Sequence, residues 1–226
     1  MKLITDFYKN NRFNLFIYIS GFIILGLAVN MMKASSLGSG AWDTVIINLR
    51  DFLNINLQIS WVTMGLISFL ISCILMIIVM SYRKKTKYLL MLIPVLFVAI
   101  FIDTWNIVVF HDHQANELIF QLLLYIGGAL LLPFGLSLVV KSSFPAFVFD
   151  ELMIMMVEVF KAKRITFVRL GIEFTGIFIG AVFGYLTYYH INGTLGVVNV
   201  GSFILAFSLA PIMTVYFKIL KIEKSK

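Results

Sequence analysis

The stretch Ser35–Leu49, SSLGSGAWDTVIINL, decides the fold because long apolar segments flank it on both sides. Its first half is too polar to cross a bilayer, and its second half is too apolar for an ordinary loop. Gly38-Ser39-Gly40 gives the backbone freedom, and Trp42-Asp43 then begins a short predicted helix. A short apolar segment of this kind between two spans is typically interfacial or re-entrant.

A second copy of this stretch follows at a fixed offset. Ser142-Ser143-Phe144 corresponds to Ser35-Ser36-Leu37, and Phe149-Asp150 corresponds to Trp42-Asp43. A short apolar run follows each aspartate, and proline at 145 begins the second helix where the first copy has glycines. The sequence therefore predicts two structural repeats.

The composition is that of a membrane protein. Of the 226 residues, 61% are hydrophobic and 13% are charged, whereas soluble domains average about 45–50% apolar and about 25% charged residues. We therefore predict an integral protein whose main partner is the lipid bilayer. The net charge of +7 lies in short runs between apolar segments, which suits anionic lipid headgroups and argues against nucleic acid as a partner.

Six apolar segments are long enough to cross a bilayer, which takes about 20 residues. The single membrane domain, 1–226, contains predicted spans at 13–32, 60–80, 88–110, 117–140, 165–189 and 195–217. Pro133 and Gly135 predict a kink or break in the fourth span, because proline removes a helix hydrogen bond.

Cationic residues are distributed unevenly among the connections between spans. Lysine and arginine are concentrated in the N-terminal segment, in 81–87, in 161–164 and in the C-terminal tail, and are absent from 111–116 and 190–194. The positive-inside rule therefore predicts that both termini are cytoplasmic. The two cations of the external 33–59 connection, Lys33 and Arg50, are expected to be balanced by Asp43 and Asp51.

Three spans per repeat is an odd number, so the second repeat enters the membrane from the opposite side. Repeat 1 covers 13–110 and repeat 2 covers 117–217. We predict an all-α membrane protein with six transmembrane helices in two inverted three-helix repeats, each with a short broken or re-entrant helix after its first span. Many secondary transporters have this architecture and bind their substrate at the repeat interface.

Two interpretations of the paired aspartates, Asp43 and Asp150, stay open. In the first, they are ordinary carboxylates at the starts of surface helices, where the helix dipole favours them. In the second, two broken helices dip in from opposite faces toward one central site, since irregular backbone at membrane depth must be buried or line a cavity. The candidate substrate-binding residues are then Gly38, Gly40, Trp42, Asp43, Phe149, Asp150 and Glu173.

The motif residues also resemble a family. The chain resembles the bacterial YczE/YyaS/YitT-type membrane proteins in its first motif, at Leu37, Gly38, Trp42 and Asp43. The second aspartate motif, the six spans and Gly193-Thr194 before the last span add to this resemblance. Ala41 stands where the family pattern has proline, so the turn is expected to be looser. The resemblance covers nearly the whole chain and implies a multi-pass protein of the bacterial plasma membrane. The family is largely uncharacterised and implies no substrate.

Other polar residues within the spans have a structural and a functional interpretation each. Arg169 and Glu173 lie one helical turn apart and can pair, but ionisable groups within a span are also functional candidates, and Glu173 is the deeper of the two. Asp103, toward the outer end of the third span, either marks the membrane interface or belongs to such a site.

The remaining motifs favour packing over chemistry. Gly176, Gly180 and Gly184 form a small-residue stripe that allows close helix approach, either within the chain or across a homodimer. His111 and His113 make a poor metal site with only Asp112 beside them, and no nucleophile set, phosphate-binding loop or dinucleotide fingerprint is present in the sequence. We therefore predict neither metal nor cofactor, and no enzymatic activity.

The leading functional hypothesis is a small-solute permease with its site between the two aspartate motifs. The alternative is a non-transporting accessory or scaffold protein of the membrane. A polar, water-reachable cavity at the repeat interface favours the permease, whereas a dry core of phenylalanine, leucine and methionine favours the accessory role.

Overall fold

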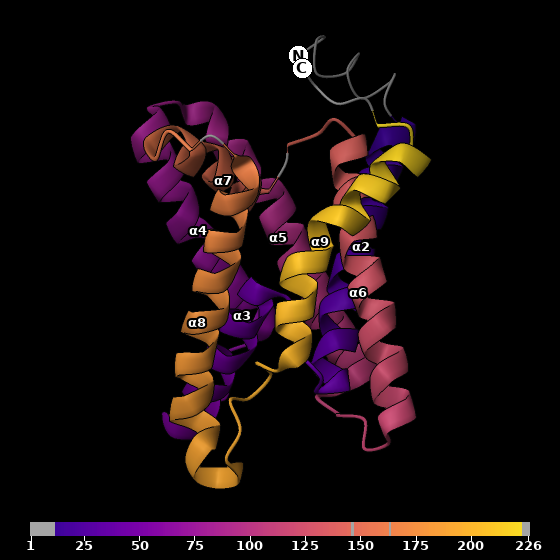
Figure 1. Cartoon of the computed structure of the whole chain (residues 1–226), viewed down its shortest axis with the longest axis vertical. Coiled ribbons are helices and arrows are strands. Elements are labelled where there is room, and N and C mark those ends of the chain that lie inside the picture. The colour runs from indigo at the N-terminus through magenta and orange to yellow at the C-terminus, as the bar shows by residue number, and fades with distance from the viewer. Residues whose placement is uncertain (1–11, 146, 163, 223–226) are drawn as a thin grey trace.

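The computed structural model describes residues 12–145, 147–162 and 164–222, and this part of the chain is helical without strands (Figure 1). The helices are α2 (Arg12–Ser35), α3 (Ala41–Asp51), α4 (Met64–Arg83), α5 (Leu92–Trp105), α6 (Leu118–Lys141), α7 (Val148–Val159), α8 (Ile165–Asn192) and α9 (Val200–Ile219). Short π-helical turns at Phe52–Asn56 and Asn106–Phe110 extend α3 and α5, and a 3-10 helix at Thr86–Met91 precedes α5.

Six helical segments of the described chain are long and apolar enough to cross a membrane, as predicted. They are Arg12–Ser35, Met64–Arg83, Tyr88–Phe110, Leu118–Lys141, Ile165–Asn192 and Val200–Ile219. Their outward faces carry large exposed apolar side chains such as Ile74, Phe178 and Phe207, because these faces meet lipid rather than water. The protein is therefore a multi-pass membrane protein.

The structure corrects two sequence predictions about the spans in detail. The last span begins at Val200 rather than at 195, because Gly193 and Gly196 adopt positive φ angles of 71° and 64° and the Asn199 side chain accepts a hydrogen bond from the amide of Val200. Of the kink or break predicted at Pro133 and Gly135, the break is excluded, since α6 runs through both residues without interruption, and the kink stays a prediction.

The first helices of the two predicted repeats, α2 and α6, pack closely through glycines. A Cβ on Gly21 would lie 2.8 Å from a Val139 methyl group, and a Cβ on Gly128 would lie 2.6 Å from Met32 Cγ. Gly21 and Gly128, like Met32 and Val139, correspond at the same offset as Trp42 and Phe149. The contact is therefore reciprocal, as in an isologous interface between two identical subunits.

The bundle has two chemically different ends. At the terminal end, where α2 begins and α9 ends (Figure 1), lie most of the basic residues of the described chain: Arg12, Arg83, Lys84, Lys85, Lys141, Lys161, Arg164, Lys218 and Lys221. At the opposite end, which we call the loop end, lie the connections 36–63, 106–117 and 193–199.

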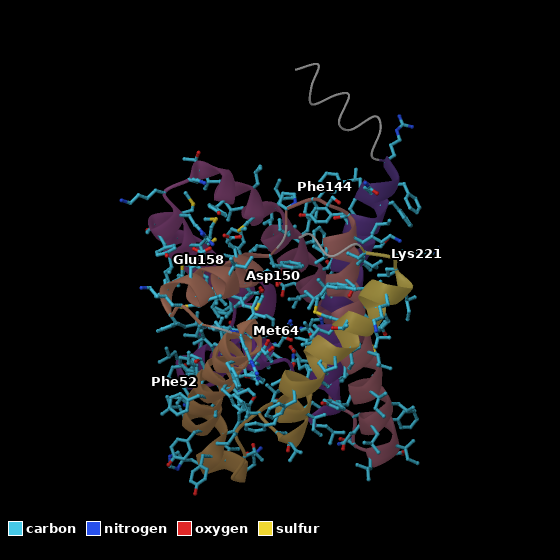
Figure 2. All side chains as sticks on the ribbon, turned by 45° about the horizontal axis from the view of Figure 1, so that its top comes forward. Phe52, Met64, Phe144, Asp150, Glu158 and Lys221 are labelled. Atoms are coloured by element: carbon cyan, nitrogen blue, oxygen red, sulfur yellow. The ribbon has the colours of Figure 1, made fainter. Side chains whose placement is uncertain are left out.

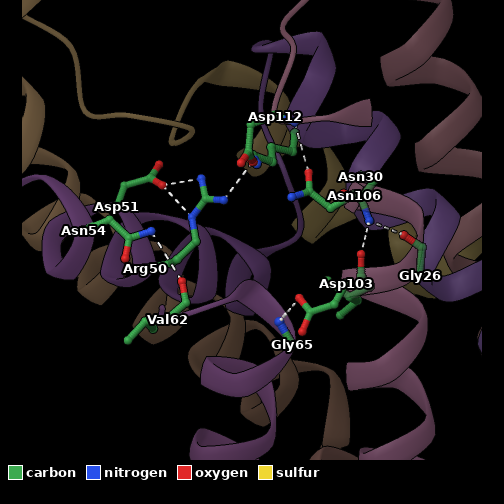
Figure 3. A network of polar contacts seen from close by, with 12 residues as sticks. Gly26, Asn30, Arg50, Asp51, Asn54, Val62, Gly65, Asp103, Asn106 and Asp112 are labelled. Atoms are coloured by element: carbon green, nitrogen blue, oxygen red, sulfur yellow. Dashed lines mark hydrogen bonds and ion pairs between the residues drawn. The ribbon is translucent and has the colours of Figure 1, made fainter. Parts of the chain in front are cut away.

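The two cations of the loop end, Lys33 and Arg50, are both held in ion pairs. Lys33 pairs with Asp112, and Arg50 bridges Asp112, at 2.7 Å, to Asp51 (Figure 3). Asp51 in turn accepts a hydrogen bond of 2.7 Å from the Tyr188 hydroxyl of α8. The expected balance of charge at this end therefore comes from Asp51 and Asp112, and not from Asp43.

The glycine stripe of α8 packs against α3 within the chain. A Cβ on Gly180 would lie 2.3 Å from the Thr44 hydroxyl, and a Cβ on Gly184 would lie 2.1 Å from the Leu195 carbonyl oxygen. The buried Asn48 amide of α3 completes this contact by donating to the Gly180 and Leu195 carbonyls at 2.9 and 3.0 Å. The stripe is thus covered by the chain itself, which removes it as the basis for the predicted homodimer.

Candidate functional site

The two copies of the motif have the same local structure at their first residues. We call residues 35–43 motif 1 and residues 142–150 motif 2. The hydroxyl of Ser35 donates to the Met32 carbonyl and accepts from the Leu37 amide, and the hydroxyl of Ser142 makes the two corresponding bonds to Val139 and Phe144. The next serine of each copy takes a positive φ, 58° in motif 1 and 60° in motif 2. The chain therefore turns in the same way after α2 and after α6.

Asp43 and Asp150 occupy the same position in their helices. Gly40 caps α3 and Phe147 caps α7, so each aspartate is the third residue of its helix. This is the position from which a carboxylate reaches back to the free amide of the capping residue, and the Gly40 amide does hydrogen-bond the Asp43 carboxylate. Both aspartates are therefore helix-start carboxylates, as the first interpretation expected.

Neither aspartate lies at a free surface, however. The starts of α3 and α7 both face a cavity of about 190 Å³ inside the bundle, which apolar side chains of α2, α5, α6 and α9 complete. Gly40, Trp42, Asp43, Phe149, Asp150 and Glu173 line this cavity. Figure 2 shows Asp150 in the interior of the bundle, with Glu158 of the same helix further out. Six of the seven predicted residues are thus brought together.

The seventh predicted residue, Gly38, lies outside the cavity and serves packing. Its φ of 137° is one that only glycine adopts readily, and a Cβ there would lie 2.4 Å from the Ser202 amide nitrogen at the start of α9. Asp103 is also structural, because at the start of α4 it accepts hydrogen bonds from the Thr63 hydroxyl at 2.6 Å and from the Gly65 amide at 2.7 Å (Figure 3).

The charged groups of the cavity are not paired with one another by direct ion pairs. Among the described residues, none joins Arg169 to Glu173, although both line the cavity, and the Arg169 guanidinium instead contacts Met213 Sδ at 3.7 Å. Burial and the nearby Glu173 carboxylate raise the pKa of Asp43 to about 7, against the opposing effect of the Gly40 amide. Burial also raises the pKa of Asp150, although Arg169 opposes this.

The two motifs meet through their aromatic residues. The rings of Trp42 and Phe149 lie with their centroids 5.0 Å apart and their planes inclined by 50°. The indole Nε1 of Trp42 is buried and has no hydrogen-bond partner among the described residues. This pair connects the starts of α3 and α7 at one side of the cavity.

The two motifs differ in how they are held. Motif 1 is fastened to the start of α9, because the Gly201 amide donates to the Leu37 carbonyl at 3.0 Å and the Ser39 amide donates to the Ser202 hydroxyl at 3.1 Å. Motif 2 is instead held to α2, because the Tyr18 hydroxyl donates a hydrogen bond to the Pro145 carbonyl. The hydrogen bonds between motif 1 and α9 thus form a seam at the loop-end side of the cavity.

Several lining residues were not singled out from the sequence. Ser68 and Ser72 of α4 are two buried hydroxyl residues, and Phe147 precedes α7. The two serines lie one turn apart on an otherwise apolar span, a spacing that places them on one face. Among the described residues, no group of three or more histidine, cysteine or acidic side chains is placed to hold a metal ion.

These features define the class as a six-span membrane protein whose two motif helices meet at an internal cavity. Residues 12–218 match the model of a family of unknown function, DUF6198, and the chain belongs to this family. It is also 28% identical over 152 residues, 67% of this chain and 72% of the other, to the uncharacterized protein YyaS of Bacillus subtilis (strain 168). No solved structure matches the chain. The resemblance to YyaS is thus confirmed, whereas the links to YczE and YitT stay predictions.

Proposed function

We propose that the protein is a small-solute permease built from two inverted repeats, with its binding site in the cavity between motif 1 and motif 2. The observation that carries the proposal is the convergence of two equivalent helix starts, each with an aspartate at its third position, on one internal cavity. Helix ends of this kind at a repeat interface form the substrate sites of many secondary transporters.

Three relationships support the repeat part of the proposal. The serine turns after α2 and α6 carry the same hydrogen bonds, the α2–α6 glycine contacts are reciprocal, and each motif helix packs on a span of the other repeat. In the last case α3 packs against α8 and α7 packs against α4. Since each repeat has three spans, such a pseudo-two-fold axis lies in the plane of the membrane.

The character of the cavity favours a permease over an accessory or scaffold role. Three acidic side chains and one arginine face an internal cavity, although ionisable groups within a membrane protein are costly and are retained mainly for function. A scaffold needs no such groups, and apolar packing would hold its spans together at lower cost.

The proposed orientation places the terminal end at the cytoplasmic face of a bacterial plasma membrane. Most basic residues of the described chain lie at that end, while both loop-end cations are neutralised by Asp51 and Asp112. The positive-inside rule counts lysine and arginine near the ends of spans, and the terminal end carries more of them than the loop end, so this distribution favours a cytoplasmic terminal end.

A cysteine on α4 tests whether the cavity is wet. In a Cys73→Ser background, Ser72→Cys places a thiol on the cavity, and Ile74→Cys places a matched thiol on the lipid face of the same helix. We expect a membrane-impermeant methanethiosulfonate to modify Cys at 72 and to leave Cys at 74 unmodified, because only the first thiol reaches water. Equal resistance at both positions would mean a dry core and would favour the accessory role.

Transport itself is tested in proteoliposomes with a panel of small cationic, anionic, zwitterionic and neutral solutes. We expect uptake of at least one class above that of protein-free vesicles, and we expect modification of Ser72→Cys to stop it while modification of Ile74→Cys does not. A modifiable thiol at 72 without uptake of any panel member would count against the permease.

A further inference from the structure

We propose that the cavity binds a small organic cation, a compact ammonium ion, between the carboxylates of Asp43 and Asp150 and beside the rings of Trp42 and Phe149. This inference rests on the proposed function above and names the chemical class of its substrate.

The balance of charge around the cavity favours a cation over an anion. Glu173 and Arg169 of α8 both line the cavity without forming an ion pair, and their opposite charges cancel in the net charge of the lining, which leaves the two aspartates. Each aspartate faces the start of its own helix, whose dipole is equivalent to roughly half a positive charge. When both carboxylates are ionised, they exceed the two helix ends by roughly one negative charge, which a monovalent cation neutralises.

Asp150 supplies a second, independent reason. Asp150 is half-buried and lines the cavity, and no hydrogen bond or ion pair from another described residue reaches its carboxylate. A carboxylate among mostly apolar side chains is costly without a partner, whereas the corresponding Asp43 at least meets the Gly40 amide. A protonated amine in the cavity would donate the missing hydrogen bonds to Asp150.

The rest of the lining indicates an organic cation rather than a metal ion. The described residues include no cluster of metal-ligating side chains, and most of the lining is apolar, with Trp42 and Phe149 beside the aspartates. Aromatic faces attract ammonium groups within about 6 Å of the ring centroid. The cavity of about 190 Å³ is smaller than the roughly 300–1,000 Å³ of sites for drug-sized ligands, so the cation is compact.

Binding to the purified full-length protein tests the class. Ethanolamine and choline serve as cationic probes, propionate as the anionic probe and 2-propanol as the neutral probe, each measured by the rise in the thermal unfolding midpoint with ligand concentration. We expect one or both cations to stabilise the protein in a saturable manner, and we expect propionate and 2-propanol to leave the midpoint unchanged.

Variants that change the charge of the cavity test whether negative charge strengthens ligand binding. Asp43→Asn and Asp150→Asn should each weaken cation binding at least about tenfold, because a charge-assisted hydrogen bond is lost, whereas Arg169→Gln should strengthen it. Glu117→Gln removes an exposed carboxylate at the loop end, just before α6, and should leave cation binding unchanged. Since Arg169→Gln predicts a gain, a general loss of folding cannot imitate the expected pattern.

Two results would overturn the proposal. The first is stabilisation by propionate that Arg169→Gln abolishes, and the second is binding of neither cation by a protein whose proteoliposomes take up solutes of another class. Either result would be compatible with the proposed permease but would exclude a cation as its substrate. A failure of the permease itself would instead appear as an unreactive cysteine at 72 and no uptake of any solute.

Discussion

Trp42 and Phe149 lie with their ring centroids 5.0 Å apart at the starts of two helices that belong to different halves of the chain. They are equivalent residues of motif 1 and motif 2, so this contact joins each motif to its own counterpart. In the inverted repeat that we propose, a contact between equivalent residues lies on or near the pseudo-two-fold axis. The Trp42–Phe149 pair would then mark the position of that axis.

A double-mutant cycle on this pair measures how strongly the motifs are coupled. We expect Trp42→Ala and Phe149→Ala to be less than additive, with a coupling free energy of about 0.5–1.5 kcal/mol, which is typical of aromatic pairs in contact. The measurement is the free energy of unfolding in detergent micelles for the wild type, both single variants and the double variant. Strict additivity would mean that the rings are neighbours without energetic coupling.

The packing of α3 against α8 predicts opposite effects for two glycines of the same helix. Gly180→Ala should destabilise the protein by about 1–3 kcal/mol, as overpacking does, because its Cβ would lie 2.3 Å from the Thr44 hydroxyl. Gly171→Ala meets no atom within 4 Å and should be neutral or stabilising by up to about 1 kcal/mol through helix propensity. Thermal unfolding of both variants checks the difference, and equal midpoints would contradict the close approach.

The ion pairs of the loop end predict an acid-dependent stability. Burial opposes ionisation of Asp112, but hydrogen bonds from Lys33 and Arg50 outweigh it and hold the pKa of this carboxyl well below its usual range. Because the pKa is lowered by folding, the contribution of Asp112 is complete above the unfolded value of about 3.9 and is lost as the pH falls further toward the folded value.

The variant Asp112→Asn isolates this contribution. It should be less stable than the wild type by about 1 kcal/mol, since water screens a half-exposed carboxylate, and the gap should stay constant from pH 5 to pH 8 and narrow below about pH 4. Unfolding midpoints of the two proteins across this pH range provide the measurement, with Glu117→Gln as control. A gap that persists unchanged at pH 3 would mean that Asp112 acts through something other than its charge.

The orientation in the membrane is checked by single cysteines in a Cys73→Ser background. With the terminal end in the cytoplasm, an impermeant thiol reagent added outside intact cells should label Gln114→Cys and should leave Lys85→Cys unlabelled until the cells are opened. The reverse pattern would invert the assignment.

The sequence was sufficient for the spans and for the neighbourhood of the site, but not for its details. The six spans followed from hydropathy, and the two copies of the motif followed from the match of Trp42-Asp43 with Phe149-Asp150. Both are local signals, because long apolar runs and rare polar matches can be read directly along the chain. The sequence predicted that the last span begins at 195, but α9 begins at Val200. The Asn199 cap and two positive-φ glycines keep the apolar residues 195–198 out of the helix.

Long-range contacts were not predictable from a single sequence. The pairing of Lys33 and Arg50 with Asp112 joins segments that no local pattern connects. The same holds for the glycine stripe, since the sequence allowed a partner helix in the chain or in a second copy, and only the fold places α3 against it. Arg169 and Glu173 had the spacing of an ion pair, but each faces the cavity without meeting the other.

The seam between motif 1 and α9 leads to the last prediction. If solute passes through the cavity, the loop end must open at some stage, and the bonds from the Ser39 amide to Ser202 and from the Gly201 amide to Leu37 must then break. Ser39→Cys combined with Ser202→Cys, in a Cys73→Ser background, places two thiols across this seam. Oxidation to a disulfide should therefore abolish uptake into proteoliposomes, and reduction should restore it.

The two single-cysteine variants serve as controls, because oxidation cannot link the seam in either of them. A further thiol at Ser72 would distinguish a closed seam from a collapsed protein, since the cavity should keep its reactivity toward an impermeant reagent from the terminal end in the oxidised state. Uptake that continues at the wild-type rate after complete oxidation would show that solute does not pass between motif 1 and α9.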